Sequence, residues 1–207
     1  MKKTLSVLLS LLLICGISLA EDAVSSATLS VDRLPAVEST GSSILVAYFS
    51  TDDTVRAAAC TVADTLSADL FEIRPAEPYT ANDVNYHDRK SRTSIEQNDP
   101  QARPEIASFP EDLSRYDTIV LGYPIWWGQA PRILCTFVEN ADLSGKTVIP
   151  FCTSGSSGVG SSASNLQKLT DESTVWLDAK RISNGSSAEE IRAWAESHGL
   201  KKAGGQT

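Results

Sequence analysis

Five short apolar runs alternate with segments whose apolar residues recur at helical spacing, and this alternation constrains the fold most strongly. The first run, 44–49, is continuously apolar, as expected of a strand that is covered on both faces. The predicted strands are 44–49, 70–73, 118–121, 147–151 and 174–177, and the predicted helices are 54–66, 131–138, 161–169 and 187–198. Strands that alternate with helices favour an α/β fold with a doubly wound, five-stranded parallel sheet.

Local signals mark the ends of two of these helices. Pro131 suits the first turn of the helix over 131–138, because its missing N–H would be unpaired there in any case. Ser187 and Glu190 have the spacing of a capping box, and Gly199 follows the last helix.

The segment 75–110 interrupts the alternation and shows no clean period. We predict that it is an insertion with one helix over 86–94. Many of its residues are polar, and its five prolines, which disfavour long regular elements, are Pro75, Pro78, Pro100, Pro104 and Pro110.

The N-terminal residues are typical of a secretory signal peptide. Lys2 and Lys3 precede a largely apolar stretch over 5–19, and Ser18 and Ala20 provide the small residues of a cleavage site after Ala20. A retained membrane anchor is the alternative, although the apolar stretch is shorter than the roughly 20 residues that span a membrane. We therefore predict a signal peptide over 1–20 and an extracytoplasmic protein, either secreted or periplasmic.

Cys15 leaves open a lipoprotein in which the lipid is carried on that cysteine. Against this, the bulky Ile14 stands where a small residue normally precedes the lipidated cysteine. The rest of the chain divides into a flexible leader over 21–42, rich in Ser, Thr, Ala and acidic residues, a folded domain over 43–199 and a tail over 200–207.

Charge and cysteine content exclude several kinds of partner. The 18 basic residues include Lys2 and Lys3, so cleavage after Ala20 leaves 16 against 26 acidic residues, a formal charge of −10. Such a charge argues against nucleic acid and anionic membranes as partners, which leaves a lipid anchor as the only membrane contact. The three remaining cysteines have no CxxC spacing, and we predict no metal site.

Three polar loops each follow a predicted strand. In this architecture such loops lie at the carboxyl ends of the strands, where ligands bind. Together, a hydroxyl-rich loop, a paired-tryptophan loop and a glycine–serine loop indicate one ligand with a phosphate and a flat ring. The candidate binding residues are Ser50, Thr51, Asp52, Asp53 and Thr54 in the first loop, Pro124, Ile125, Trp126, Trp127 and Gly128 in the second, and Thr153, Ser154, Gly155, Ser156 and Gly158 in the third.

The first loop joins a strand to a helix, where backbone N–H groups and the positive helix end can hold a phosphate. Asp52 and Asp53 complicate this reading, since a carboxylate about 4 Å from a phosphate charge costs roughly 1 kcal/mol in water and about 4 kcal/mol at an effective dielectric constant of 20. The alternative is an ordinary turn in which an aspartate caps the helix.

The other two loops also have a functional and a structural interpretation. In the second loop, one indole can line a ring pocket while the other packs inward, or both can fill the core. Stacking on an aromatic side chain contributes about 0.5–1.5 kcal/mol beyond burial. In the third loop, glycine permits close approach of the backbone to a ligand, although a flexible connector has the same composition.

The sequence contains no recognisable catalytic constellation, so we predict no catalytic residues. Its only histidines are His87 and His198, and it has neither a G-x-S-x-G elbow nor a phosphate-binding G-x-x-x-x-G-K-[ST] loop. A serine hydrolase remains a weaker alternative.

At these loops the chain resembles the flavodoxin family, and especially its short branch with an insertion after the second strand. The resemblance implies the strand order 2-1-3-4-5 and flavin mononucleotide (FMN) at the carboxyl edge, with its phosphate at the first loop and its ring between the other two. The family's phosphate loop has a central glycine, where this chain has Asp52 or Asp53, depending on the register. The matching stretches are 44–50, 70–73 with Pro75, 91–93, 98–99, 103–104, 122–131 and 146–158.

The resemblance leads us to expect an extracytoplasmic FMN-binding protein that transfers electrons or reduces a small acceptor such as a quinone. Its partners would then be FMN and either a redox partner protein or a small acceptor. The insertion over 75–110 would cover the ring and form a substrate pocket. The alternative is a flavodoxin-fold binding or scaffold protein with weakened or lost FMN binding, which the acidic pair and secretion both favour.

Overall fold

The computed structural model of the chain describes residues 42–183 and 186–200. The predicted signal peptide and Cys15 lie outside the described residues, as do the leader except Ser42 and the tail except Leu200. Ser42 is buried and its hydroxyl accepts the Ile44 N–H at 3.1 Å, while Leu200 packs against one of the two cores.

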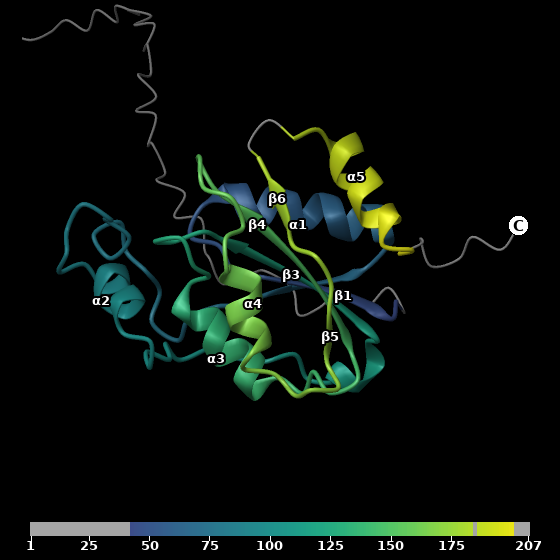
Figure 1. Ribbon diagram of the computed structural model, residues 1–207, viewed down its shortest axis with the longest axis horizontal. Helices are drawn as coiled ribbons and strands as arrows, with labels where there is room; N and C mark the ends of the chain where they lie inside the picture. Colours follow the sequence, from purple (N-terminus) through teal and green to yellow (C-terminus); the bar gives the residue numbers. More distant parts are fainter. Residues whose placement is uncertain (1–41, 184–185, 201–207) are drawn as a thin grey trace, which may run out of the picture. The chain divides into compact units, whose positions relative to one another are not determined.

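A parallel sheet forms the centre of the described domain (Figure 1). The order β2-β1-β3-β4-β5 confirms the predicted arrangement, with every pair parallel and a short sixth strand also paired with β4. The strands are β1 (Ile44–Tyr48), β2 (Asp69–Glu72), β3 (Thr118–Pro124), β4 (Thr147–Thr153), β5 (Val175–Trp176) and β6 (Lys180–Ile182).

β5 and β6 are two halves of one edge strand. Thr147 pairs with Val175, but Phe151 pairs with Lys180, so the edge strand has gained one residue relative to β4 between the two halves. This extra residue is a bulge, which bends the strand and re-aims its side chains. The predicted fifth strand over 174–177 therefore continues, after the bulge, into a segment that the apolar pattern did not reveal.

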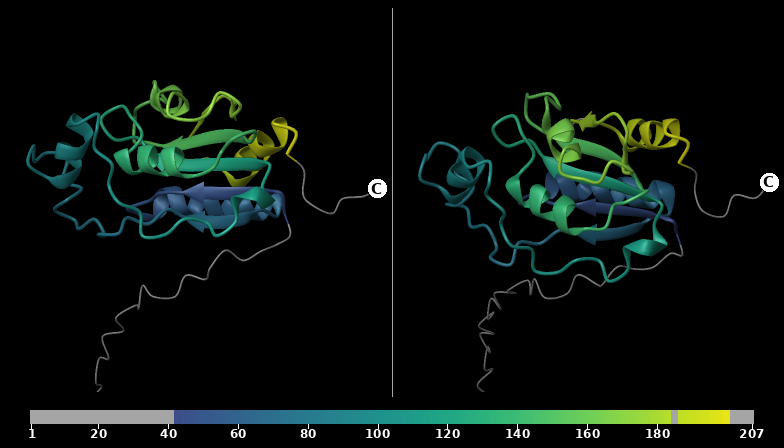
Figure 2. Two further views of the ribbon diagram at one scale, coloured as in Figure 1. Left: turned by 90° about the horizontal axis from the view of Figure 1, so that it is seen from below. Right: turned by 60° about the horizontal axis from the view of Figure 1, so that its bottom comes forward.

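Helices cover both faces of the sheet (Figure 2). One core lies between the sheet and helices α1 (Asp53–Leu66) and α5 (Ala188–Ser197). The other lies between the sheet and helices α3 (Arg132–Asn140) and α4 (Ser162–Gln167). Alternate side chains of each strand point to opposite faces, which is why the strands are apolar throughout.

The helix predicted over 86–94 is wrong. The insertion instead carries α2 (Arg92–Asn98), and a 3-10 turn (Leu113–Arg115) follows it. Three side chains of the insertion accept a nearby backbone N–H. Asp83 accepts that of Thr80 at 2.8 Å, Asn85 that of His87 at 3.1 Å, and Asp88 that of Lys90 at 2.8 Å. Short polar side chains that bond locally favour turns over helix. The helix begins only after Ser91, whose hydroxyl accepts the Ser94 N–H as its N-cap.

The capping box predicted for the last helix is present, with Ser187 and Glu190 bonded reciprocally. Cys60, Cys135 and Cys152 are free thiols, of which Cys60 is partly exposed. Within the described ranges, no helix combines the length and the apolar character needed to cross a membrane.

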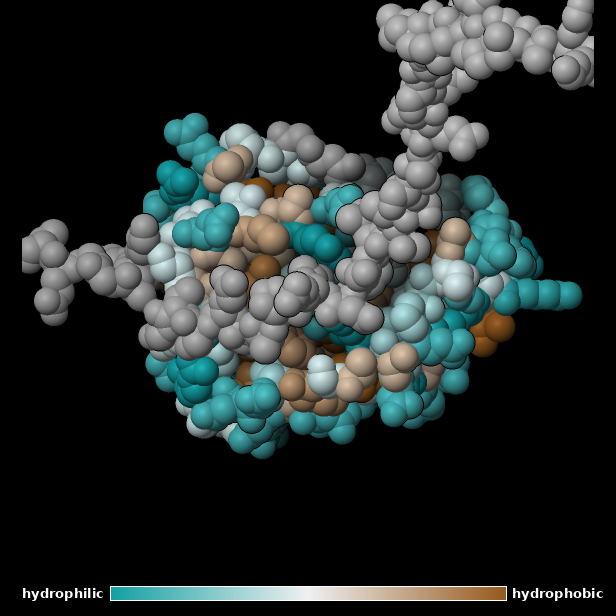
Figure 3. Space-filling model, turned by 180° about the vertical axis from the view of Figure 1, so that it is seen from behind, coloured by the Kyte–Doolittle hydropathy of each residue, from teal (hydrophilic) through white to brown (hydrophobic). Residues whose placement is uncertain are grey.

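Hydrophilic side chains dominate the periphery of the face drawn in Figure 3, with apolar residues in small patches between them. Among the described residues, the exposed large hydrophobic side chains are Tyr86, Ile95, Trp127 and Val175. Trp127 is therefore the one candidate binding residue that leaves a large apolar surface in solvent.

Candidate functional site

The three candidate loops meet at the carboxyl edge of β1, β3 and β4, which are neighbours in the sheet. The Ile125 N–H of the second loop donates to the Thr153 carbonyl at the start of the third, at 2.9 Å. Thr54 of the first loop and Thr153 line the same cavity of about 380 Å³. The predicted convergence of the loops is thus present in the fold, and it occurs where the strand order reverses.

The first loop is closed by its own side chains. Asp52 is the N-cap of α1, and its carboxylate accepts the Thr54 N–H at 2.8 Å. The Ser50 hydroxyl donates to the Asp52 carbonyl. Thr51, Asp52 and Asp53 are exposed, while Ser50 and Thr54 are half-buried. Asp52 therefore holds a first-turn N–H group, one of the donors that an anion at the helix start would use.

The second loop is a tight turn from Trp126 to Gln129, which exchange two backbone hydrogen bonds of 2.9 Å. Its central residues, Trp127 and Gly128, have φ angles of +48° and +75°. Two positive φ angles define a type I′ turn, which glycine and asparagine favour. A left-handed conformation costs a tryptophan roughly 1–2 kcal/mol, and such strain is concentrated at functional sites.

The two tryptophans face different surroundings. The ring of Trp126 packs edge-on against Phe49 and Tyr79, with centroids 5.5 and 5.7 Å away. Trp127 is 44% exposed. One indole is therefore half-buried against the core and the other is exposed, an arrangement in which Trp127 could receive a flat ring. That role for Trp127 stays a prediction.

The third loop is held by a side chain that the sequence reasoning missed. Arg181 of β6 donates to the Ser154 hydroxyl at 3.0 Å and to the carbonyls of Ser154 and Gly155, each at 3.1 Å. Ser154 also donates to the Ser157 carbonyl. These contacts order the start of a loop for which a flexible connector was the alternative interpretation. In the sequence, the contact was signalled only by the position of Arg181, a basic residue shortly after the predicted fifth strand.

The exposed end of the third loop carries the remaining candidates, Ser156 and Gly158. A Cβ added at Gly155 or Gly158 would meet no atom within 4 Å. Open space beside these glycines leaves the backbone accessible to a ligand edge.

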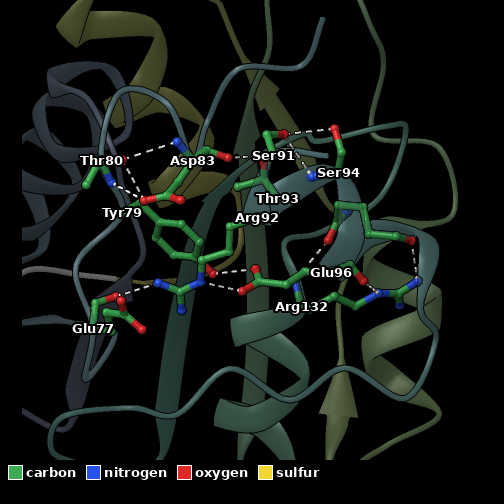
Figure 4. Close-up of polar contacts among 11 residues, drawn as sticks. Glu77, Tyr79, Thr80, Asp83, Ser91, Arg92, Thr93, Ser94, Glu96 and Arg132 are labelled. Carbon is green, nitrogen blue, oxygen red and sulfur yellow. Dashed lines mark hydrogen bonds and ion pairs between the residues drawn. The ribbon is translucent and has the colours of Figure 1, made fainter. Parts of the chain in front are cut away.

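The insertion joins this edge through Tyr79, which packs against Phe49 as well as Trp126. The Tyr79 hydroxyl donates to Glu96 at 2.6 Å, and the Arg92 guanidinium lies 4.1 Å from the Tyr79 ring centroid and pairs with Glu96 at 2.7 Å (Figure 4). Burial, and then the bond to Glu96, raise the pKa of Tyr79 well above its ordinary value. Tyr79 is therefore a neutral phenol that fixes the insertion against the tryptophan turn.

Helix α2 also contacts the connection from β3 to α3 directly. Gln97 bonds the backbone of Trp126, Ala130 and Arg132, and the Arg132 side chain bonds the carbonyls of Glu96 and Gln97. None of these long-range polar contacts has a signature in the sequence.

The cavity at this edge lies between α1, the ends of β4 and β6, and the start of α5. Its lining is small and rich in hydroxyl groups: Asp53, Thr54, Ala57, Ala58, Thr61, Thr153, Ile182, Ser183, Ser186, Ala188 and Ile191. A second cavity, of about 290 Å³, lies at the amino ends of the strands beside residues 138–144 and contains none of the candidate residues. In the part of the chain that the structure describes, no three metal-binding side chains gather.

A doubly wound parallel sheet with the order 2-1-3-4-5, and polar loops gathered over its switch point, defines a flavodoxin-like α/β protein. A family model described as "Flavodoxin" matches residues 43–198, so the chain belongs to the flavodoxin family.

Solved structures agree with this assignment. A "putative flavoprotein" from Bacteroides eggerthii is 44% identical over 76% of this chain and 98% of that chain, with a TM-score of 0.71. A second putative flavoprotein, from Bacteroides uniformis, is 43% identical over 74% of this chain and 97% of that chain, with a TM-score of 0.70. A flavoprotein from Lactobacillus acidophilus in complex with FMN is 20% identical over 73% and 97%, with a TM-score of 0.59, and this likeness shows the fold alone. No curated protein matches the chain.

Proposed function

We propose that this flavodoxin binds FMN outside the cytoplasm and uses it to transfer electrons or to reduce a small acceptor of the quinone type. The observation that supports FMN binding most strongly is Trp127, an exposed indole held at a φ of +48° beside the switch point of the sheet. Stacking of a flat ring on this indole would compensate for the strain of the turn.

The residues at the ring end of the site fit FMN. Trp127 would stack on the isoalloxazine ring, and the open backbone over 154–158, fixed at its start by Arg181, would approach the ring edge. Tyr79 and Trp126 pack edge-on against each other beside the turn, with ring centroids 5.7 Å apart. When bound, FMN supplies the capacity to accept and release electrons, and the protein supplies position and electrostatics.

The phosphate end fits less well, because Asp52 already caps α1 through the Thr54 N–H. Thr54 and the remaining N–H groups of the first turn would hold the phosphate. The capping carboxylate favours the second candidate function, a flavodoxin-fold binding or scaffold protein with weakened or lost FMN binding.

The ordered insertion supports reduction of a small acceptor over simple electron carriage. Through Tyr79 it packs against Trp126, and through Gln97 it bonds the tryptophan turn, so it would form a wall beside the ring. Localisation outside the cytoplasm is supported by the N-terminal pattern of Lys2, Lys3 and the apolar stretch ending at Ala20.

A visible spectrum of the purified protein, followed by thermal unfolding with and without excess FMN, tests the proposal. We expect flavin absorbance at about 450 nm. The midpoint of thermal unfolding should rise with FMN concentration, because the ligand binds only the folded state. Colourless protein with an unfolding midpoint that does not change on addition of FMN would contradict FMN binding and support the scaffold function.

A further inference from the structure

The turn that presents Trp127 is braced by one buried side chain of the insertion. Gln97 of α2 is 9% exposed, and its Nε2 donates to the carbonyls of Trp126 at 3.0 Å and Ala130 at 3.3 Å. Its Oε1 accepts the backbone N–H of Arg132 at 3.1 Å. These partners fix the orientation of the amide, since carbonyls only accept and the N–H only donates.

Gln97 supplies a helix cap that the local sequence lacks. Pro131 stands at the N-cap of α3 and makes no side-chain capping bond. The first N–H groups of a helix need an outside acceptor, and Gln97 provides one for Arg132 from a different segment. The same amide therefore fixes the start of α3 and the carbonyls on both sides of the turn.

A strained backbone conformation persists only where its surroundings determine it. Trp127 has a φ of +48°, and the two backbone bonds between Trp126 and Gln129 close the turn around it. The Gln129 side chain also bonds Ser161 and Asn165. Gln97 adds two bonds from outside, one on each side of Trp127 along the chain.

We propose that Gln97 is a positioning residue for the ring-binding turn: it holds Trp127 in its receptive conformation, so Gln97 controls flavin binding without itself touching the flavin. The inference rests on the proposed function of Trp127. The competing explanation is that Gln97 only docks α2 onto the domain.

Arg132 offers a matched control. Its guanidinium docks the same helix, donating to the carbonyls of Glu96 at 3.3 Å and Gln97 at 3.0 Å, and no described bond joins its side chain to the turn (Figure 4). Arg132→Met therefore weakens docking and keeps the brace. Gln97→Glu keeps an acceptor for the Arg132 N–H but removes the brace. It replaces the amide donor by a carboxylate oxygen, which cannot donate to the carbonyls of Trp126 and Ala130.

The first test compares the two variants by FMN titration and by near-ultraviolet circular dichroism of the apoprotein. Gln97→Glu should raise the Kd about tenfold, as expected for lost buried hydrogen bonds, and reduce the tryptophan signal. Arg132→Met should keep the Kd within about twofold and keep the signal. An equal rise in Kd for both variants, or an unchanged Kd and spectrum in Gln97→Glu, would overturn the proposal.

The second test needs no flavin, so it separates failure of the brace from failure of FMN binding. Asparagine accepts positive φ readily, so Trp127→Asn removes the strain that the brace maintains. In the wild type, relaxation of Trp127 would offset part of the stability lost with the brace, so the loss of thermal stability caused by Gln97→Glu should be larger in the Trp127→Asn background. Equal losses in the two backgrounds would refute the brace. Gln97→Met replaces Gln97→Glu in both tests if the latter does not fold.

Discussion

The carboxylate of Asp52 accepts the Thr54 N–H at 2.8 Å, so this side chain already occupies one of the donors that a phosphate would use. Its charge also opposes a phosphate at the start of α1, by roughly 1 kcal/mol or more at short range. Asp53, the next residue, is exposed and has no capping role.

Asp52→Asn should therefore tighten FMN binding about fivefold or more, since asparagine keeps the cap and removes the charge. Titration with FMN measures the change, and Asp53→Asn is the control, with a smaller expected gain. Riboflavin, which lacks the phosphate, should bind both variants as it binds the wild type. An equal gain for riboflavin would show that the charge does not act at the phosphate.

Two buried tyrosines give the fold a defined response to alkaline pH. Burial is the main cause that raises the pKa of Tyr116 to about 12, and its 2.7 Å bond to Asp69 adds to it. Burial, followed by Glu72, raises the pKa of Tyr48 to about 12 as well. The folded state thus keeps both phenol protons to a higher pH than the unfolded state, in which tyrosine has a pKa of about 10.

Because the pKa values of Tyr48 and Tyr116 are raised on folding, their contribution to the free energy of unfolding is complete below about pH 10 and is lost between about pH 10 and 12. Urea unfolding over this range measures the decline. Tyr116→Phe removes one of the two groups and should make the decline shallower. A slope identical to that of the wild type would mean that Tyr116 does not titrate differently in the two states.

At the scale of single elements, the pairing of β3 with β4 places Gly122 beside Phe151. A Cβ at Gly122 would overlap the Phe151 ring, which is itself packed edge-on against Trp194 of α5 at 6.0 Å. Glycine is therefore required by close packing just below the tryptophan loop.

Gly122→Ala should lower the free energy of unfolding by about 1–3 kcal/mol through overpacking. Chemical denaturation measures the loss. Gly158→Ala is the matched control, because its Cβ would enter open space, and its change should stay within about 0.5 kcal/mol. Similar losses in both variants would contradict a steric cause.

The elements that the sequence predicted well are those with long, unbroken apolar periods. α1 and the strands β1, β3 and β4 lie close to their expected positions because burial on the sheet requires such periods. The helix of the insertion was misplaced because the Asn85 and Asp88 side chains, before Ser91, each accept the backbone N–H two residues further on. β6 was missed because a bulge separates it from β5 and its residues are mostly polar.

At the scale of the whole molecule, the sequence predicted that the three loops would meet but not what holds them in place. The order of β1, β3 and β4 brings the three loops together, and that order follows from the fold family. The braces are Arg181 and Gln97, polar side chains that reach across 26 or more residues to backbone groups. Such contacts leave no periodic pattern, so only the folded structure reveals them.

Binding of FMN against Trp127 can be followed by the fluorescence of the flavin itself, titrated with wild-type protein and with Trp127→Leu. The wild type should quench the flavin on binding, and Trp127→Leu should bind about three- to tenfold more weakly with less quenching, since ring stacking contributes about 0.5–1.5 kcal/mol. Equal affinity and equal quenching in the two proteins, or no quenching by either, would contradict a flavin site at the carboxyl edge of this sheet.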